Sequence, residues 1–167
     1  MDSQTTKPDT AQQAPIANAS ATAEQPWYAA YPPARSEPQA ISRHDVLQLL
    51  KSETTADSAF VLVDLRRTDY EGGTILESIN LPAQSLHPTI PSLYKIFSAA
   101  GVRQVIWYCG SSRGRGTRAA SWFADYLNEQ GDAKMKSLVL SDGIKGWVAE
   151  KGVFVRYMQE YDESKWT

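Results

Sequence analysis

The chain has 167 residues, of which 42% are hydrophobic and 22% are charged, and this composition excludes a fibrous, membrane-spanning or wholly disordered protein. Nineteen acidic residues outnumber 17 basic ones, so the net charge of -2 excludes the overall positive field that drives sequence-independent nucleic-acid binding. The single cysteine, Cys109, excludes an intramolecular disulfide and a cysteine-rich zinc site, and leaves either a packing residue or a reactive thiol.

The N-terminal residues 1–25 are rich in Ala, Gln, Thr and Ser, and we expect them to be disordered because they carry too little apolar surface to offset chain entropy. The segment 26–38 differs, since Trp27, Tyr28 and Tyr31 lie there among prolines. We expect these rings to pin the segment to the domain surface, and a linear motif for a partner protein is the alternative. The chain shows no secretory, transit or membrane-spanning pattern, so the expected location is cytoplasmic or nuclear, without membrane contact.

Hydrophobic periodicity predicts alternating helices and strands over residues 39–152. We expect helices over 42–51, 91–100 and 117–129 and a short one from 142, and strands over 60–64, 78–81, 104–108 and 137–140. The first helix begins at Ser42, which forms a pattern like a capping box with Asp45. Strands that alternate with helices indicate a parallel α/β sheet with right-handed crossovers. We expect the tail, residues 153–167, to pack on the outside of this domain.

A loop rich in glycine and serine follows the predicted strand over 104–108 and begins with Cys109. Five residues separate Cys109 from Arg115, a spacing written C-x5-R, and they are Gly110, Ser111, Ser112, Arg113 and Gly114. The loop joins the carboxyl end of a parallel strand to the N-terminus of a helix, where free N–H groups and the helix dipole attract anions. We therefore expect a small tetrahedral oxyanion to bind in this loop.

Cys109 is the candidate nucleophile, because a thiol at a helix N-terminus near arginine favours the thiolate form. Arg115 is the second candidate catalytic residue, since its planar guanidinium can clamp two oxygens and balance charge as the leaving bond breaks. The five residues between them are the candidate substrate-binding residues. Arg113, Arg115 and Arg118 concentrate positive charge around this one loop. A purely structural role for the cysteine is the alternative, but the surrounding glycines, hydroxyls and predicted elements favour a functional loop.

Several motifs in a fixed order resemble the rhodanese-like domain family. They are Asp64-Leu65-Arg66 followed by residues 69–75, then Ile79-Asn80-Leu81-Pro82, then Tyr108-Cys109, then residues 140–147. The C-x5-R loop resembles that of the dual-specificity phosphatases that activate cyclin-dependent kinases and of the yeast-type arsenate reductases. Sulfurtransferase members of the family have a loop one residue shorter.

The resemblance implies a five-stranded parallel sheet flanked by helices on both faces. It further implies that Cys109 forms a phosphocysteine, that Arg115 coordinates phosphate and that the backbone of residues 110–114 forms the cradle. Asp64 and Arg66 correspond to a pair whose implied role is structural, at the strand end beneath the loop.

The chain also departs from the family pattern. Tyr108 and Thr74 stand where family members usually have histidine. Gly110 and Gly114 stand where the kinase-activating phosphatases carry carboxylates, so no general acid is identifiable and good leaving groups are favoured.

These features favour a cysteine-dependent phosphatase of the dual-specificity type that acts on a phosphorylated protein. An arsenate reductase that acts on the small oxyanion is the first alternative. Because no second cysteine is present, its arsenylated Cys109 would need external glutathione and glutaredoxin. A thiosulfate sulfurtransferase and a non-catalytic binding module are further alternatives. We expect no metal, no nucleic-acid partner and no cofactor beyond glutathione as a co-substrate of the reductase.

Overall fold

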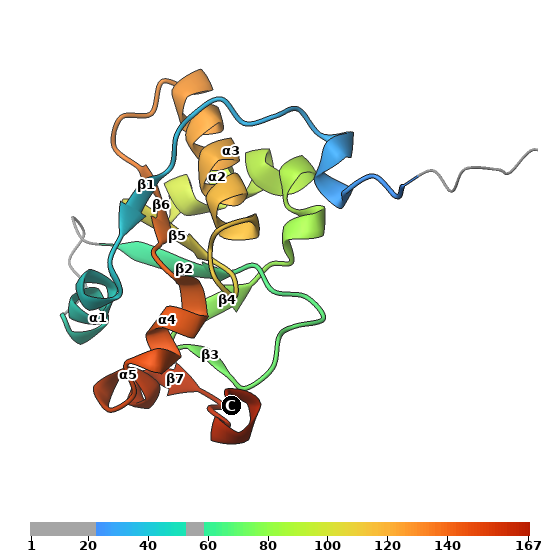
Figure 1. Ribbon diagram of the computed structural model, residues 1–167. Helices are drawn as coiled ribbons and strands as arrows, with labels where there is room; N and C mark the ends of the chain where they lie inside the picture. The colour runs from blue at the N-terminus through green and yellow to red at the C-terminus, as the bar shows by residue number, and fades with distance from the viewer. Residues whose placement is uncertain (1–22, 53–58) are drawn as a thin grey trace, which may run out of the picture.

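The computed structural model describes residues 23–52 and 59–167, and a parallel β-sheet forms its centre (Figure 1). The sheet has five strands in the order β1-β6-β5-β2-β4, and every neighbouring pair is parallel. They are β1 (Gln39–Ile41), β2 (Phe60–Asp64), β4 (Ser78–Asn80), β5 (Gln104–Tyr108) and β6 (Lys136–Leu140). The predicted five-stranded parallel sheet is thereby confirmed, and the carboxyl ends of its strands meet at one edge.

Helices cover both faces of the sheet, as the resemblance implies. One face carries α2 (Ile90–Ala99) and α3 (Arg115–Glu129), and the other carries α1 (Arg43–Lys51), α4 (Gly143–Ala149) and α5 (Val153–Arg156). Side chains alternate along β5, so Val105 and Trp107 enter the core under α2 and α3, whereas Ile106 and Tyr108 enter the opposite core. Because β5 is buried on both faces, the residue that follows it has a well-defined position.

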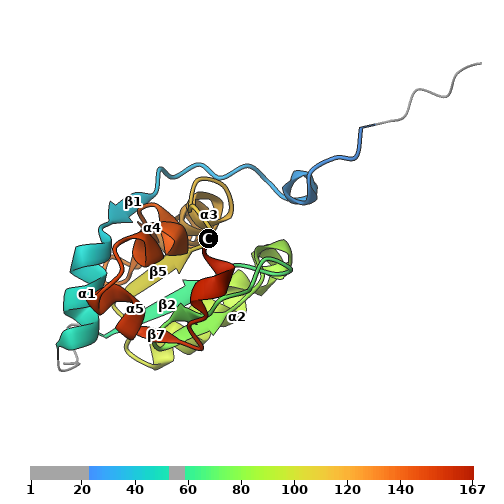
Figure 2. The same cartoon turned by 60° about the horizontal axis from the view of Figure 1, so that its bottom comes forward.

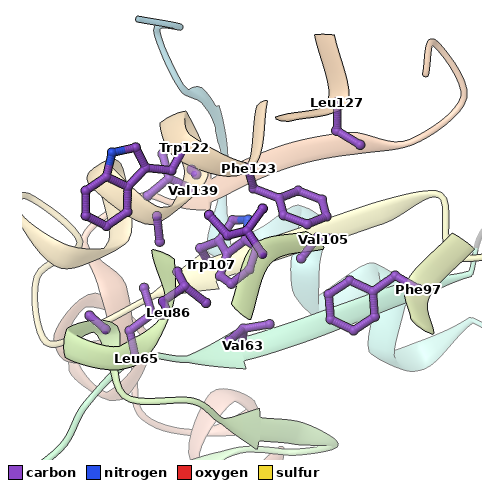
Figure 3. Packing of buried hydrophobic residues seen from close by; sticks show 14 of the residues in the cluster. Val63, Leu65, Leu86, Phe97, Val105, Trp107, Trp122, Phe123, Leu127 and Val139 are labelled. Atoms are coloured by element: carbon purple, nitrogen blue, oxygen red, sulfur yellow. The ribbon is translucent and has the colours of Figure 1, made fainter. Parts of the chain in front are cut away.

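The core beneath α3 joins that helix firmly to β5 (Figure 3). The ring of Phe123 in α3 lies 5.3 Å from the ring of Trp107, centroid to centroid, and 6.1 Å from that of Phe97 in α2. Trp107 is fully buried, and its indole N–H donates to Ser137 Oγ at 3.0 Å. Burial of a large apolar side chain contributes about 1.5–3 kcal/mol, so these contacts fix the two elements that flank Cys109.

The element bounds agree with the predicted ones to within two residues. β2 and β5 have the predicted bounds, and α1 begins after Ser42, whose Oγ accepts the N–H of Asp45 at 3.1 Å as a capping box requires. α3 begins at Arg115, two residues earlier than predicted, because the N–H of Arg118 already donates to the carbonyl of Gly114 at 3.0 Å. Arg115 therefore lies in the first turn of the helix.

The sequence does not predict several short elements. They are the edge strand β1, the antiparallel pair β3 (Thr74–Ile75) and β7 (Met158–Gln159), and the 3-10 turns η1 (Trp27–Ala30), η2 (Ala83–Ser85), η3 (His87–Thr89) and η4 (Glu163–Lys165). Elements of two to four residues are too short to show a hydrophobic period. Across the two described ranges, no helix is both long enough and apolar enough to cross a bilayer.

The segment that follows residue 26 lies along α3. Trp27 and Tyr31 pack edge-on against Trp122, with ring centroids 6.0 and 5.8 Å away. The indole N–H of Trp122 donates to the carbonyl of Pro32 at 3.0 Å. The carboxylate of Asp125 accepts the backbone N–H groups of Arg35 and Ser36. These contacts tie the aromatic segment to the helix that begins with Arg115.

The predictions for the two ends of the chain have different outcomes. Disorder is predicted over residues 1–25, and residues 1–22 of this segment lie outside the described residues. The C-terminal tail does not only pack on the outside, because Phe154 and Met158 are buried in the core beneath α1 and α4. The indole N–H of Trp147 donates to the carbonyl of Phe154 at 2.8 Å. The tail is therefore an integral part of the folded unit.

Candidate active site

Cys109 lies at the carboxyl end of β5 and is 3% exposed. Its carbonyl accepts the N–H of Ile144, and the carbonyl of Gly110 accepts the N–H of Lys145, each at 3.0 Å. Gly143 has a φ of +57°, and a Cβ at that position would collide with the carbonyl of Cys109. The start of α4 thus fixes the first residues of the loop from behind, and glycine at 143 permits the close approach.

Ser112 shapes the loop around the sulfur atom. Its φ is +60°, and this left-handed conformation turns its N–H toward Cys109 Sγ at 3.2 Å. Its hydroxyl accepts the N–H of Cys109 at 3.4 Å, and its carbonyl accepts the hydroxyl of Thr117 at 2.6 Å. Ser112 is buried, and its N–H, hydroxyl and carbonyl all form contacts within the loop and the start of α3, so it holds the loop around the sulfur.

The remaining loop residues separate into two groups. Gly110 and Ser111 line a cleft together with Arg115, whereas Arg113 and Gly114 line a separate hollow. The predicted site residues therefore lie together around Cys109, but only Gly110, Ser111 and Arg115 line the cleft. Arg113 is exposed and its side chain borders the hollow, away from the cleft.

Asp69 holds the guanidinium of Arg115 in a two-point ion pair. Arg115 Nη1 donates to Oδ1 at 2.8 Å, and Nη2 donates to Oδ2 at 2.5 Å. This hydrogen bonding is the main cause that lowers the pKa of Asp69 to about 2. It also raises the pKa of Arg115, and attraction to Cys109 adds to that rise. Asp69 is therefore ionised at neutral pH and cannot donate a proton to a leaving group.

Asp64 and Arg66 form a buried ion pair beneath this arrangement. Arg66 Nη2 donates to Asp64 Oδ2 at 2.8 Å, and both side chains are at most 2% exposed. Arg66 also donates to the carbonyls of Glu71 and Gly73, at 3.1 and 2.7 Å. The pair thus organises the loop over residues 66–73, which carries Asp69 to Arg115.

The two residues that replace the expected histidines contact each other. Thr74 Oγ1 lies 2.8 Å from Tyr108 Oη, and it donates to Asp64 Oδ2 at 2.8 Å. Tyr108 Oη also donates to Ser78 Oγ at 2.6 Å and accepts the N–H of Ile75 at 3.3 Å. Burial and then the charge of Asp64 raise the pKa of Tyr108, so its phenol stays neutral. The hydrogen bonds that these two neutral hydroxyls donate to Asp64 and Ser78 therefore support the end of β5.

Arg118 faces the N-terminal segment instead of the cleft. Its guanidinium lies 3.5 Å from the ring centroid of Tyr28 and 5.8 Å from that of Trp27. Such cation–π contacts hold the side chain against the aromatic rings. The three arginines that the sequence concentrates around the loop therefore point in different directions, and Arg115 is the one at the cleft.

The cleft beside the loop has a volume of about 840 Å³. It is lined by the loop over 66–71, by the residues at 110, 111 and 115, by α4 and the turn after it, and by the C-terminal tail. Sequence reasoning missed the roles of Asp69, Lys145 and the tail, because contacts between distant segments leave no local pattern. The one available signal for Asp69 was its place in a family motif.

Two comparisons with known sequences agree on the family. Residues 42–150 match the family model described as "Rhodanese-like domain". Arsenical-resistance protein 2 of Saccharomyces cerevisiae is 32% identical over an alignment of 95 residues, and the match covers 53% of this chain and 73% of that protein. The matched range includes β2, the loop from Cys109 and α4, and thus every element that positions Cys109, Arg115 and Asp69.

Solved structures share the fold. The As-Sb reductase from Leishmania major superposes with a TM-score of 0.64 at 24% identity, over 72% of this chain and 84% of that one. Ygr203w, described as a yeast protein tyrosine phosphatase of the Rhodanese family, superposes with a TM-score of 0.65 at 21% identity. It covers 80% of this chain, and all of its own chain is matched. At these identities the likeness concerns the fold.

Proposed function

Because the chain belongs to the rhodanese-like domain family, we propose that it is a cysteine-dependent enzyme for tetrahedral oxyanions, and that it reduces arsenate. The observation that carries the proposal is that the Ser112 N–H points at the Cys109 sulfur, while the carboxylate paired with Arg115 cannot give up a proton. Asp69 is committed to Arg115 as an ion, and the residues between Cys109 and Arg115 include no carboxylic acid.

The first step is attack of the Cys109 thiolate on the arsenic atom of arsenate. A sulfur–arsenic bond forms, one arsenic–oxygen bond breaks, and the oxygen leaves as hydroxide. The N–H of Ser112 and the guanidinium of Arg115 stabilise the negative charge before and during this exchange. Arg115 keeps one edge of its guanidinium on Asp69 and has its remaining N–H groups for the oxyanion.

Reduction then needs two electrons from outside the chain. An external thiolate attacks the sulfur of Cys109, a disulfide bond forms, and the sulfur–arsenic bond breaks with its electron pair remaining on arsenic. A second external thiol releases Cys109 from the mixed disulfide. Since Cys109 is the one cysteine of the sequence, both thiols must come from other molecules.

Neither Asp69 nor the residues between Cys109 and Arg115 can give a proton to a leaving group, and this favours arsenate over most phosphate esters. Expulsion of an alkoxide from a phosphoserine or phosphothreonine depends on a general acid, which contributes typically 10²–10⁴-fold to such a step. Arsenate exchanges its oxygens readily in water and needs less assistance. The 32% identity over 95 residues to an arsenical-resistance protein supports the same choice.

Hydrolysis of aryl phosphates is the second candidate. The loop binds phosphate as well as arsenate, because both are tetrahedral oxyanions, and a phenolate leaves without a general acid. The aromatic side chains of Tyr161 and Trp166 line the cleft beside the loop and fit an aryl group. This activity would pass through a phosphocysteine at Cys109.

The two candidates are tested in parallel on the wild type and Cys109→Ser. Arsenate-dependent oxidation of glutathione in the presence of glutaredoxin measures reduction, and para-nitrophenyl phosphate at mildly acidic pH measures hydrolysis. We expect arsenate reduction in the wild type and none in the variant. Hydrolysis without arsenate reduction would assign the phosphatase activity, and activity of the variant in either assay would exclude Cys109 as the nucleophile.

A further inference from the structure

We propose that the cleft beside the loop binds the reducing co-substrate, a small thiol that carries carboxylate groups, and that Lys145, Lys151 and Lys165 recognise those carboxylates. The inference rests on the proposed arsenate reduction and adds a binding site to it. Its first support is size. Pockets of about 300–1,000 Å³ hold ligands much larger than an oxyanion, and this cleft has a volume of about 840 Å³. Arsenate in the loop leaves most of the cleft free for a second reactant.

The second support is the charge of the cleft. Lys145 lies in α4, Lys151 follows it and Lys165 comes from the tail, and all three are exposed and line the cleft. Within the described residues, none of the three forms an ion pair, whereas the arginines of the cleft are paired with Asp64 and Asp69. The lysines therefore remain available to an incoming anion.

The same cleft also contains acidic groups that are not paired with arginine. Glu71 and Glu163 line it together with the lysines. A mixed lining of this kind suits a ligand with carboxylates and an ammonium group, such as a small peptide thiol. The apolar contacts that such a ligand needs come from Ile144, Val148 and Trp166.

The position of Lys145 connects the cleft to the reacting atoms. Its Cε lies 3.6 Å from the place where a Cβ on Gly110 would be, so the side chain crosses the loop directly after Cys109. Gly110 and Ser111 line the same cleft. A thiol bound among the lysines thus lies beside the residues that directly follow Cys109, and from there its thiolate can attack the sulfur and expel arsenic(III).

The tail that supplies Lys165 is held beside the cleft by strand pairing and by hydrogen bonds to the backbone of Gly72. β7 pairs with β3, and the carbonyl of Gly72 accepts the indole N–H of Trp166 at 2.8 Å and the N–H of Asp162 at 3.3 Å. Gly72 has a φ of +77°, and a Cβ there would collide with the indole of Trp166. Figure 2 shows the tail beside the end of the sheet to which β2 and β5 point.

Part of the cleft lining lies beyond the family domain. The family model ends at residue 150, whereas Lys151, Lys165 and Trp166 follow it. The loop and Arg115 therefore select the oxyanion, and the tail selects the reductant.

The test compares a charged thiol with a neutral one in the full-length enzyme. Initial rates of arsenate reduction are measured with glutathione and with 2-mercaptoethanol for the wild type, for Lys151→Gln/Lys165→Gln and for the matched control Lys95→Gln/Lys136→Gln. Both lysines of the control are absent from the cleft. We expect the ratio of kcat/KM for glutathione to kcat/KM for 2-mercaptoethanol to fall at least fivefold in the cleft variant and to stay unchanged in the control.

A binding measurement keeps this test independent of turnover. Binding of S-methylglutathione, which cannot react, to Cys109→Ser is followed by the fluorescence of its tryptophans and by calorimetry, with and without the two lysine substitutions. We expect binding that weakens at least fivefold in the cleft variant and with rising salt, because exposed charge pairs are screened. Absence of binding to Cys109→Ser, equal binding by both lysine variants, or reduction that glutaredoxin supports without glutathione would overturn the proposal. Failure of arsenate reduction alongside intact binding would instead contradict the proposed function.

Discussion

Asp69 and Arg115, 46 residues apart in the sequence, form a two-point ion pair at the mouth of the loop, with distances of 2.8 and 2.5 Å. The ion pair orients the Arg115 guanidinium toward Cys109, because Asp69 fixes one edge of it. Asp69 is itself held in place by the buried Arg66, which binds two carbonyls of the loop over residues 66–73. Asp69 is thus a positioning residue for Arg115 and supplies no proton.

We expect Asp69→Asn to lower kcat/KM for arsenate about tenfold, because a neutral amide holds the guanidinium less firmly and misplacement of a charged group weakens transition-state stabilisation. Glu37→Gln, an exposed carboxylate outside the cleft, is the matched control. Steady-state kinetics with separate kcat and KM values measure the effect. A kinetic constant equal to that of the control would show that Arg115 needs no partner.

The pKa of Asp69 also predicts a pH dependence. Its folded-state pKa of about 2 lies below the value of about 4 of an unfolded aspartate, so the ionised form stabilises the fold above pH 4 and this contribution is lost as the pH falls toward 2. The difference in unfolding free energy between wild type and Asp69→Asn should be constant from pH 5 to 8 and should shrink below pH 4. Urea denaturation across this range measures it, and a difference that changes near pH 6 would contradict the assignment.

The contact between Thr74 and Tyr108 predicts energetic coupling. Tyr108→Phe and Thr74→Val each remove a buried hydrogen bond and should each lower the unfolding free energy by about 1–2 kcal/mol. The double variant should lose less than the sum of the two, by about 0.5 kcal/mol or more. Chemical denaturation of the four proteins completes the cycle, and strictly additive losses would show that the two hydroxyls act independently.

The different surroundings of two arginines predict different kinetic effects. Arg115→Lys should lower kcat/KM for arsenate about a hundredfold, because an ammonium cannot hold Asp69 and the oxyanion together. Arg118→Lys should change it less than threefold, because the guanidinium of Arg118 lies on Tyr28 and Trp27. Equal losses in the two variants would place Arg118 in the oxyanion site after all.

Much of the fold could be predicted from the sequence, for a physical reason. β2 and β5 are compact runs of β-branched and aromatic residues buried on both faces, and such runs stand out without knowledge of their neighbours. The loop from Cys109 was equally visible, since its glycines and hydroxyls lie between a predicted strand and a predicted helix. Local chemistry encodes these features.

What escaped prediction depends on contacts between distant segments. The pairing of β3 with β7 involves two residues on each strand, and the contact of Trp166 with Gly72 spans 94 residues. The three neighbouring arginines looked equivalent in the sequence, but helix geometry and the aromatic segment before residue 32 direct them apart. The direction of a side chain follows from packing, which no short motif records.

The central claim is that Cys109 carries out arsenate reduction with electrons from external thiols. The most direct measurement is the formation of arsenite from arsenate by the purified wild type and by Cys109→Ser, with glutathione and glutaredoxin present and one glutathione disulfide counted for each arsenite. We predict arsenite in stoichiometric yield from the wild type and none above background from Cys109→Ser. Arsenite formation by Cys109→Ser at the wild-type rate, or none by either protein, would contradict the account.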